Sequence, residues 1–256
     1  MSPPEFKDGM IPYRLYNIGG AIMNLLFSIP TMLIWVTAKP DGLGKIICIL
    51  WTMVGLFSAA ANGIPMSVGP IDNDGKNAIN LGKNRKALRA FGLQLKVNKM
   101  QMEGYLLSEM PEEWFELPEM EDMENPMIAV LGALHCNRLM EEKHFEEVSY
   151  KIGELLQGAK GMLGVHRLLL QLDQVFCEIM SSQNEKILNI MNEKQMKQFM
   201  NSMKNYPAVL RTQYAYALNI EKDVVKAEKI KRRFENIMKT YPIQGELNIE
   251  RQFIEM

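Results

Sequence analysis

Apolar positions are distributed unevenly along this 256-residue chain. Between residues 15 and 71 the only charged side chains are Lys39, Asp41 and Lys45. From Asp72 onward charges are dense, and apolar residues recur at helical spacing. The pattern predicts two parts that face different surroundings, rather than one globule.

Two uncharged runs, at 15–38 and 46–61, flank the polar turn "KPDGLGK" at 39–45. A helix that crosses a bilayer needs roughly 20 apolar residues, which the first run supplies. The second run is shorter, but Lys45 can snorkel and residues 62–64 can extend it. A buried helical pair in a soluble protein is the alternative. Because the two runs follow each other directly, the pattern favours a two-helix transmembrane hairpin.

Basic residues near the ends of these runs predict an orientation. Lys7 and Arg14 precede the hairpin, and the turn carries only Lys39 and Lys45. Five basic residues follow it closely: Lys76, Lys83, Arg85, Lys86 and Arg89. The positive-inside rule therefore places both chain termini in the cytoplasm, in an integral membrane protein for which a bacterial plasma membrane is the expected location.

The remaining chain predicts three further segments beyond a polar stub at 1–14 and the hairpin region at 15–79. An amphipathic helix is expected within 80–110, with a basic first half that either rests on anionic lipid or serves only as a topology signal. Prolines interrupt the acidic stretch 111–126, which predicts a linker; together these make up a juxtamembrane region at 80–126. Residues 127–256 form the last segment, a helical domain.

Paired amphipathic patterns define this helical domain. Helices are predicted near 127–142 and 145–156, then at 163–180 and 185–203, and as a last pair within 207–242. The last pair is similar to a tetratricopeptide helical hairpin. The fold class expected is therefore all-α, with a hairpin-repeat or solenoid-like domain that recruits protein or peptide partners.

Composition narrows the functional classes. The net charge is −1, so the overall charge does not suggest a nucleic-acid partner. Membrane lipid is expected as a partner of the hairpin, and proteins or peptides as partners of the helical domain. The cysteines, Cys48, Cys136 and Cys177, show no paired spacing and are interpreted as reduced core residues. His135, His144 and His166 lie in or beside predicted helices, where structural roles are favoured over metal binding.

Three short motifs lie within or after the two apolar runs. They are "GAIMN" at 20–24, "NGIP" at 62–65 and "DG" at 74–75. Gly20 and Asn24 share one helix face, where a small residue permits close packing and an amide can hydrogen-bond across an interface. In order and type, the three motifs resemble those of the site-2 protease family of membrane-embedded zinc metalloproteases.

The resemblance implies that Asp74, the aspartate before Gly75, is a zinc ligand. Asn62 and Pro65 then shape the approach to the metal. A carboxylate of this kind completes a two-histidine site and leaves one position for water. Since the interval from Pro65 to Asp74 is longer than the family's usual spacing, Asp72 is a rival for the ligand position.

The family's His-Glu-x-x-His motif is missing from the chain. That motif belongs to a transmembrane helix preceding the glycine–asparagine segment, so the chain looks like the second half of such a protease, with Met1 as an internal start. No catalytic residue and no bound zinc are expected for this chain alone. Two hypotheses stay open: part of an intramembrane zinc protease, or a membrane-anchored adaptor whose helical domain binds proteins.

The basic flanks lead to a prediction about topology. A reporter that is active only outside the cytoplasm should stay silent when it is fused after Met256, because both termini are expected inside. The same reporter inserted in the turn at 39–45 should be active. Strong activity from the fusion after Met256 would reverse the orientation.

Overall fold

The computed structural model describes residues 12–69 and 71–256. Most of the predicted polar stub therefore lies outside the described residues. The chain divides into two compact units, with the division between Arg89 and Ala90.

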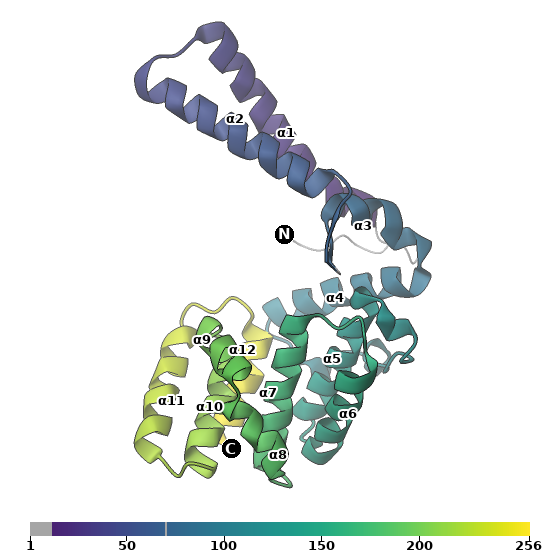
Figure 1. Ribbon diagram of the computed structural model, residues 1–256, viewed down its shortest axis with the longest axis vertical. Helices are drawn as coiled ribbons and strands as arrows, with labels where there is room; N and C mark the ends of the chain where they lie inside the picture. The colour runs from purple at the N-terminus through teal and green to yellow at the C-terminus, as the bar shows by residue number, and fades with distance from the viewer. Residues whose placement is uncertain (1–11, 70) are drawn as a thin grey trace. The chain divides into compact units, whose positions relative to one another are not determined.

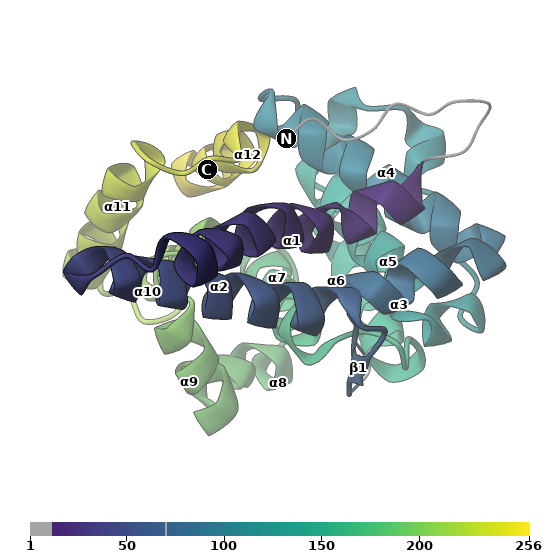
Figure 2. The same cartoon turned by 90° about the horizontal axis from the view of Figure 1, so that it is seen from above.

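The first unit is built on a helical hairpin. Helix α1 (Tyr13–Ala38) and helix α2 (Gly42–Gly63) run side by side in opposite directions (Figures 1 and 2). The connecting turn has Lys39 and Gly42 in the left-handed region, at φ 45° and 56°. Both helices are long and apolar enough to cross a membrane.

Small side chains fill the contact between the two helices. The buried residues of the two helices include Ala21, Ser28, Thr52 and Ala59. A Cβ added to Gly55 would clash with the Ser28 hydroxyl, so the backbones approach closely there. In contrast, large apolar side chains point away from the pair, as Leu50 and Phe57 do with 59% and 76% of their surface exposed.

A short β-hairpin and a short helix follow α2. Strands β1 (Ser67–Val68) and β2 (Ile71–Asp72) pair antiparallel, with Ser67 opposite Asp72. Helix α3 (Asp74–Asn80) and a 3-10 turn η1 (Leu81–Lys83) complete the segment. Gly82 of η1 lies against the Tyr13 ring, which ties this segment to the start of α1.

Helix α4 (Arg85–Met102) contains the division between the units, and the acidic stretch after it is not a free linker. That stretch contains 3-10 turns, η2 (Leu107–Glu109), η3 (Glu112–Trp114) and η4 (Asp122–Glu124). Phe115 is buried in a cluster with Val97, and Trp114 packs against the same cluster. The two rings therefore serve packing, and the prolines exclude one continuous helix, as predicted.

The second unit is helical throughout its described elements. Its helices are α5 (Pro126–Glu141), α6 (Phe145–Gly158), α7 (Gly164–Met180), α8 (Glu185–Leu188), α9 (Lys194–Ser202), α10 (Pro207–Asn219), α11 (Val224–Met238) and α12 (Gln244–Glu255). Helix α7 packs against α6 and α10, and α10 packs against α11 (Figure 1). The all-α class is confirmed, while a regular solenoid repeat stays a prediction.

One predicted helix is divided in two. The sequence pattern indicated a single helix over 185–203, but α8 and α9 are separated by the 3-10 turn η5 (Asn189–Asn192). Asn184 caps the start of α8, and two further asparagines lie in η5. Asparagine side chains compete with helical backbone bonds, which accounts for the break. Helix α12, which the pattern analysis did not identify, closes the unit.

A buried charged group joins three helices of this unit. Arg211 of α10 is fully buried, and its guanidinium contacts Asp173 Oδ1 of α7 at 2.5 Å and Glu250 Oε1 of α12 at 3.0 Å. The same guanidinium lies 4.5 Å from the centre of the Phe176 ring. The cation is therefore paired with two carboxylates and stacked on an aromatic face.

All three cysteines are free thiols, as expected. Cys136 and Cys177 are fully buried in the helical unit, and Cys48 is half-buried in α2. Burial raises the pKa of the Cys136 thiol to about 12, so the reactive thiolate is disfavoured.

The buried charged group generates a stability prediction. Replacing Arg211→Met leaves Asp173 and Glu250 without their cation and should lower the free energy of unfolding by about 3–5 kcal/mol. The matched control is Arg232→Met, because the Arg232–Glu228 pair is exposed and should contribute less than about 1 kcal/mol. Chemical denaturation of the chain in detergent, followed by circular dichroism, measures both. Equal effects of the two changes would contradict a central role for Arg211.

Candidate metal-ligand segment at the end of the hairpin

The candidate site lies where α2 ends and α3 begins. The last carbonyl groups of a helix and the first N–H groups of the next lack partners within their own helices. Here one side chain, Asn73, supplies partners to both. Its position directly before α3 is the N-cap position, at which asparagine is strongly preferred.

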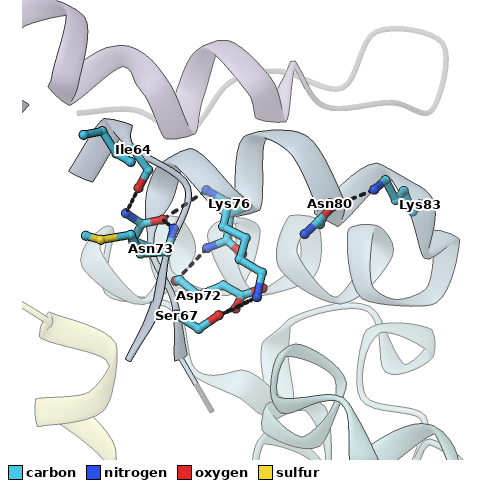
Figure 3. A network of polar contacts seen from close by, with 9 residues as sticks. Ile64, Ser67, Asp72, Asn73, Lys76, Asn80 and Lys83 are labelled. Carbon is cyan, nitrogen blue, oxygen red and sulfur yellow. Dashed lines mark hydrogen bonds and ion pairs between the residues drawn. The ribbon is translucent and has the colours of Figure 1, made fainter. Parts of the chain in front are cut away.

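Asn73 makes four side-chain hydrogen bonds with backbone groups. Its Nδ2 donates to the carbonyl oxygens of Ala61 and Ile64, at 2.7 and 2.6 Å. Its Oδ1 accepts from the N–H groups of Met66 and Lys76, at 2.9 and 3.1 Å. Figure 3 shows this side chain between the end of α2, the β-hairpin and α3.

Gly75 permits the close approach of the two helices. A Cβ on Gly75 would clash with the carbonyl oxygen of Gly63, the last residue of α2. Any larger residue would force α3 away from α2. The glycine of the Asp-Gly motif therefore has a packing reason, independent of any chemistry.

Asp72 is engaged within the β-hairpin. Its Oδ1 accepts a hydrogen bond from Ser67 Oγ at 2.6 Å and lies 3.0 Å from Lys76 Nζ (Figure 3). Burial opposes ionisation, but the hydrogen bonds from Ser67 and Lys76 and the Lys76 charge prevail and lower the pKa of this carboxyl. A metal ion at Asp72 would have to replace these contacts.

Asp74 has no such engagement. It is the exposed first residue of α3, and among residues 12–69 and 71–256 no hydrogen bond or ion pair to its side chain is found. Partial desolvation raises the pKa of its carboxyl. Of the two aspartates, Asp74 is therefore the one whose oxygens are available to a ligand.

The other motif residues have varied surroundings. Asn62 and Pro65 are both exposed, on either side of the α2 terminus. Gly20 is exposed as well, and a Cβ there would meet open space, so it lies outside the contact between α1 and α2. Asn24 is half-buried, and its backbone carbonyl oxygen lies close to Gly55.

The histidines are far along the chain from this segment, in the helical unit. His135 Nδ1 contacts the Phe115 carbonyl oxygen at 2.7 Å, which is a structural role. His144 is exposed at the start of α6, and burial lowers the pKa of His166. In the part of the chain that the structure describes, no three His, Cys, Asp or Glu side chains are grouped to hold a metal.

Among the described residues, the donors at this segment therefore do not make up a catalytic zinc site. Such a site takes about three protein ligands, and the hairpin segment offers one available carboxylate.

Sequence reasoning missed Asn73, Ser67 and Lys76, which organise the segment. An asparagine before a helix start was a recognisable capping signal for Asn73. The roles of Ser67 and Lys76 depend on the pairing of β1 and β2. Strands of only two residues are too short to produce a recognisable alternation in the sequence.

Comparisons with protein-family models, with curated proteins and with solved structures find no match to this chain. Any functional role for the segment between α2 and α3 therefore has to be argued from its motifs and their geometry.

The bonding of Asn73 generates a local prediction. Replacing Asn73→Ala should raise amide hydrogen exchange at Met66 and Lys76 and destabilise α3 by about 1–2 kcal/mol, the usual value of a cap. Asn73→Asp should keep those two amides protected, because aspartate still accepts, while it loses the donations to the carbonyl oxygens of Ala61 and Ile64. The control is Asn80→Ala, whose side chain contacts only Lys83 in the hydrogen bonds described. Exchange measured by mass spectrometry that leaves Asn73→Ala indistinguishable from Asn80→Ala would refute the capping role.

Proposed function

We propose that the hairpin of α1 and α2 lies in a lipid bilayer. The support is the distribution of side chains: small residues fill the contact between the helices, and large apolar residues cover the outside. This arrangement is costly in water, because large exposed apolar patches are rare on soluble proteins, but it is usual among helices packed in lipid. The orientation with both termini in the cytoplasm belongs to this proposal.

Within that setting, we propose that the chain contributes the aspartate ligand of an intramembrane zinc metalloprotease of the site-2 type. The observation that carries this is the contrast between two neighbouring carboxylates. Asp72 is held by Ser67 and Lys76, whereas Asp74 is exposed and unengaged at the end of the hairpin. Asn73 and Gly75 fix the backbone on either side of Asp74.

Catalysis then requires a second element. A helix bearing the His-Glu-x-x-His motif would add two nitrogen ligands and a general base, which with one carboxylate make a three-ligand site open to water. The chain contains no such motif, so zinc binding and peptide cleavage are proposed only for the completed assembly.

The second candidate function is that of a membrane-anchored adaptor. Packed neighbours α6 and α7, α7 and α10, and α10 and α11 favour it, because arrays of helical pairs present surfaces to peptides and helices. In this version the tetratricopeptide-like resemblance carries the function, and Asp74 has no metal to bind.

One experiment separates the two functions. The chain is co-expressed in membranes with a transmembrane helix carrying His-Glu-x-x-His, and cleavage of a membrane peptide is measured. Asp74→Asn should reduce cleavage by more than the about 10–100-fold that loss of an outer-shell partner of zinc costs, because asparagine keeps the shape but loses the charge. Asp72→Asn is the matched control and should keep most activity.

Metal analysis after dialysis supplies the other half of the test. The chain alone should retain no stoichiometric zinc, and the assembly should retain one equivalent that Asp74→Asn removes. Equal loss of cleavage and zinc in Asp74→Asn and Asp72→Asn would contradict the assignment of Asp74 as the specific zinc ligand. If the assembly neither retains zinc nor cleaves the peptide, the protease function is contradicted and the adaptor function is favoured.

A further inference from the structure

A cavity of about 290 Å³ opens within the helical unit, apart from the hairpin segment. Helices α4, α5, α7, α10 and α12 contribute to its walls. The lining combines apolar side chains with carboxylates, and it includes the charged group centred on Arg211. Neither proposed function uses this cavity.

Most of the carboxylates at the cavity are already satisfied. Glu141 Oε2 accepts from the Ser108 N–H at 2.8 Å, and Glu246 Oε2 accepts from the Tyr241 hydroxyl at 2.7 Å. Asp173 Oδ1 accepts from Arg211. These groups have partners in the fold and need no ligand.

Glu250 is different. Its Oε1 accepts from Arg211 Nη1, but its Oε2 is buried without any hydrogen-bond partner among the described residues. The side chain is only 5% exposed, and the residue lines the cavity. An unpaired buried carboxylate oxygen is costly, so a partner for it is expected from the cavity.

The chemistry of the walls selects the class of partner. Arg211 is one cation between two carboxylates, so the group carries a net negative charge beside the cavity when both carboxyls are ionised. The described acidic side chains are not grouped as metal ligands, which disfavours a metal ion. Leu134, Ile249 and Phe253 provide apolar contact for a hydrocarbon chain.

We propose that this cavity binds a primary alkylammonium group, whose hydrocarbon lies on the apolar wall and whose ammonium pairs with Glu250 Oε2. The group is carried either by a free amine or by a lysine side chain. Asn137 of α5 and Gln101 of α4 line the same cavity and offer amide oxygens to the remaining ammonium hydrogens.

Proton exchange accompanies binding. Burial raises the pKa of Glu250 to about 8 despite the opposing attraction of Arg211, so a proton occupies this carboxyl near neutral pH. An arriving ammonium favours the ionised carboxylate, and the proton leaves to solvent. Binding should therefore strengthen as the pH rises through 8.

The other titratable groups that face Glu250 do not reverse the expected increase of affinity with pH. The acids are Asp173 from α7, Glu246 from its own helix and Glu141 from α5, and burial raises the pKa of each. Their ionisation on raising the pH also adds negative charge and favours a cation. Burial raises the pKa of Tyr206 and lowers that of His166, so both stay neutral across this range.

Isothermal titration calorimetry of the full chain in detergent micelles tests the proposal, with n-butylammonium chloride as the probe. Saturable binding is expected, tighter by roughly tenfold or more at pH 8.5 than at pH 6.5, with a proton released in buffers of different ionisation heat. Sodium chloride at equal ionic strength and uncharged n-pentanol are the ligand controls. Nα-acetyl-lysine N-methylamide tests the lysine source: its binding assigns a peptide ligand, and its exclusion assigns a free amine.

Variants complete the test. Glu250→Gln should weaken butylammonium binding by about tenfold or more, because a charge-assisted hydrogen bond is lost. Glu255→Gln, an exposed residue on the same helix, should bind as the unchanged chain does. If Glu250→Gln does not fold by circular dichroism, Ala133→Leu fills the cavity from α5 and should abolish binding with Glu250 intact.

Three outcomes would overturn the proposal. They are no saturable binding to the unchanged chain at pH 8.5, equal affinity for n-pentanol, and unchanged affinity in Glu250→Gln or in Ala133→Leu.

Discussion

The end of α2 imposes the constraint on which the first unit depends. Carbonyl groups at a helix terminus need donors, and the following chain must supply them within a few residues. Asn73 donates to two of these carbonyl oxygens and caps α3 with its own oxygen. Gly75 then lets α3 approach the backbone of Gly63. Together they hold the first turn of α3, with Asp74 on it, directly at the end of the hairpin.

The same interactions explain why two aspartates so close in sequence differ in chemistry. The β-hairpin places Asp72 opposite Ser67 and beside Lys76, so its carboxylate is occupied. Asp74 begins α3 as an exposed residue, and among residues 12–69 and 71–256 no partner holds its carboxylate. A site that needs an available carboxylate therefore has one candidate in this segment.

The two units bury opposite kinds of side chain. The hairpin hides small residues and two hydroxyls, Ser28 and Thr52, and exposes its large apolar groups. The helical unit hides large apolar groups together with a complete charged group around Arg211. In the second unit, the cation joins helices α7, α10 and α12, and its second carboxylate is left with one free oxygen at a cavity.

Sequence periodicity by itself determined the apolar hairpin, because long uncharged runs between polar turns have few folded alternatives. It also located α5, α6, α7, α10 and α11, whose apolar spacing is local information. The motif resemblance implied Asp74 as a ligand and left Asp72 as a rival, since spacing carries no information about which carboxylate is already paired. Only the tertiary structure shows that Asp72 is the paired carboxylate, through its contacts with Ser67 and Lys76. The group of Arg211, Asp173 and Glu250 likewise became visible only in the fold. Arg211 is 38 residues from Asp173 and 39 from Glu250 in the sequence, and each charge alone is typical of a solvated helix face.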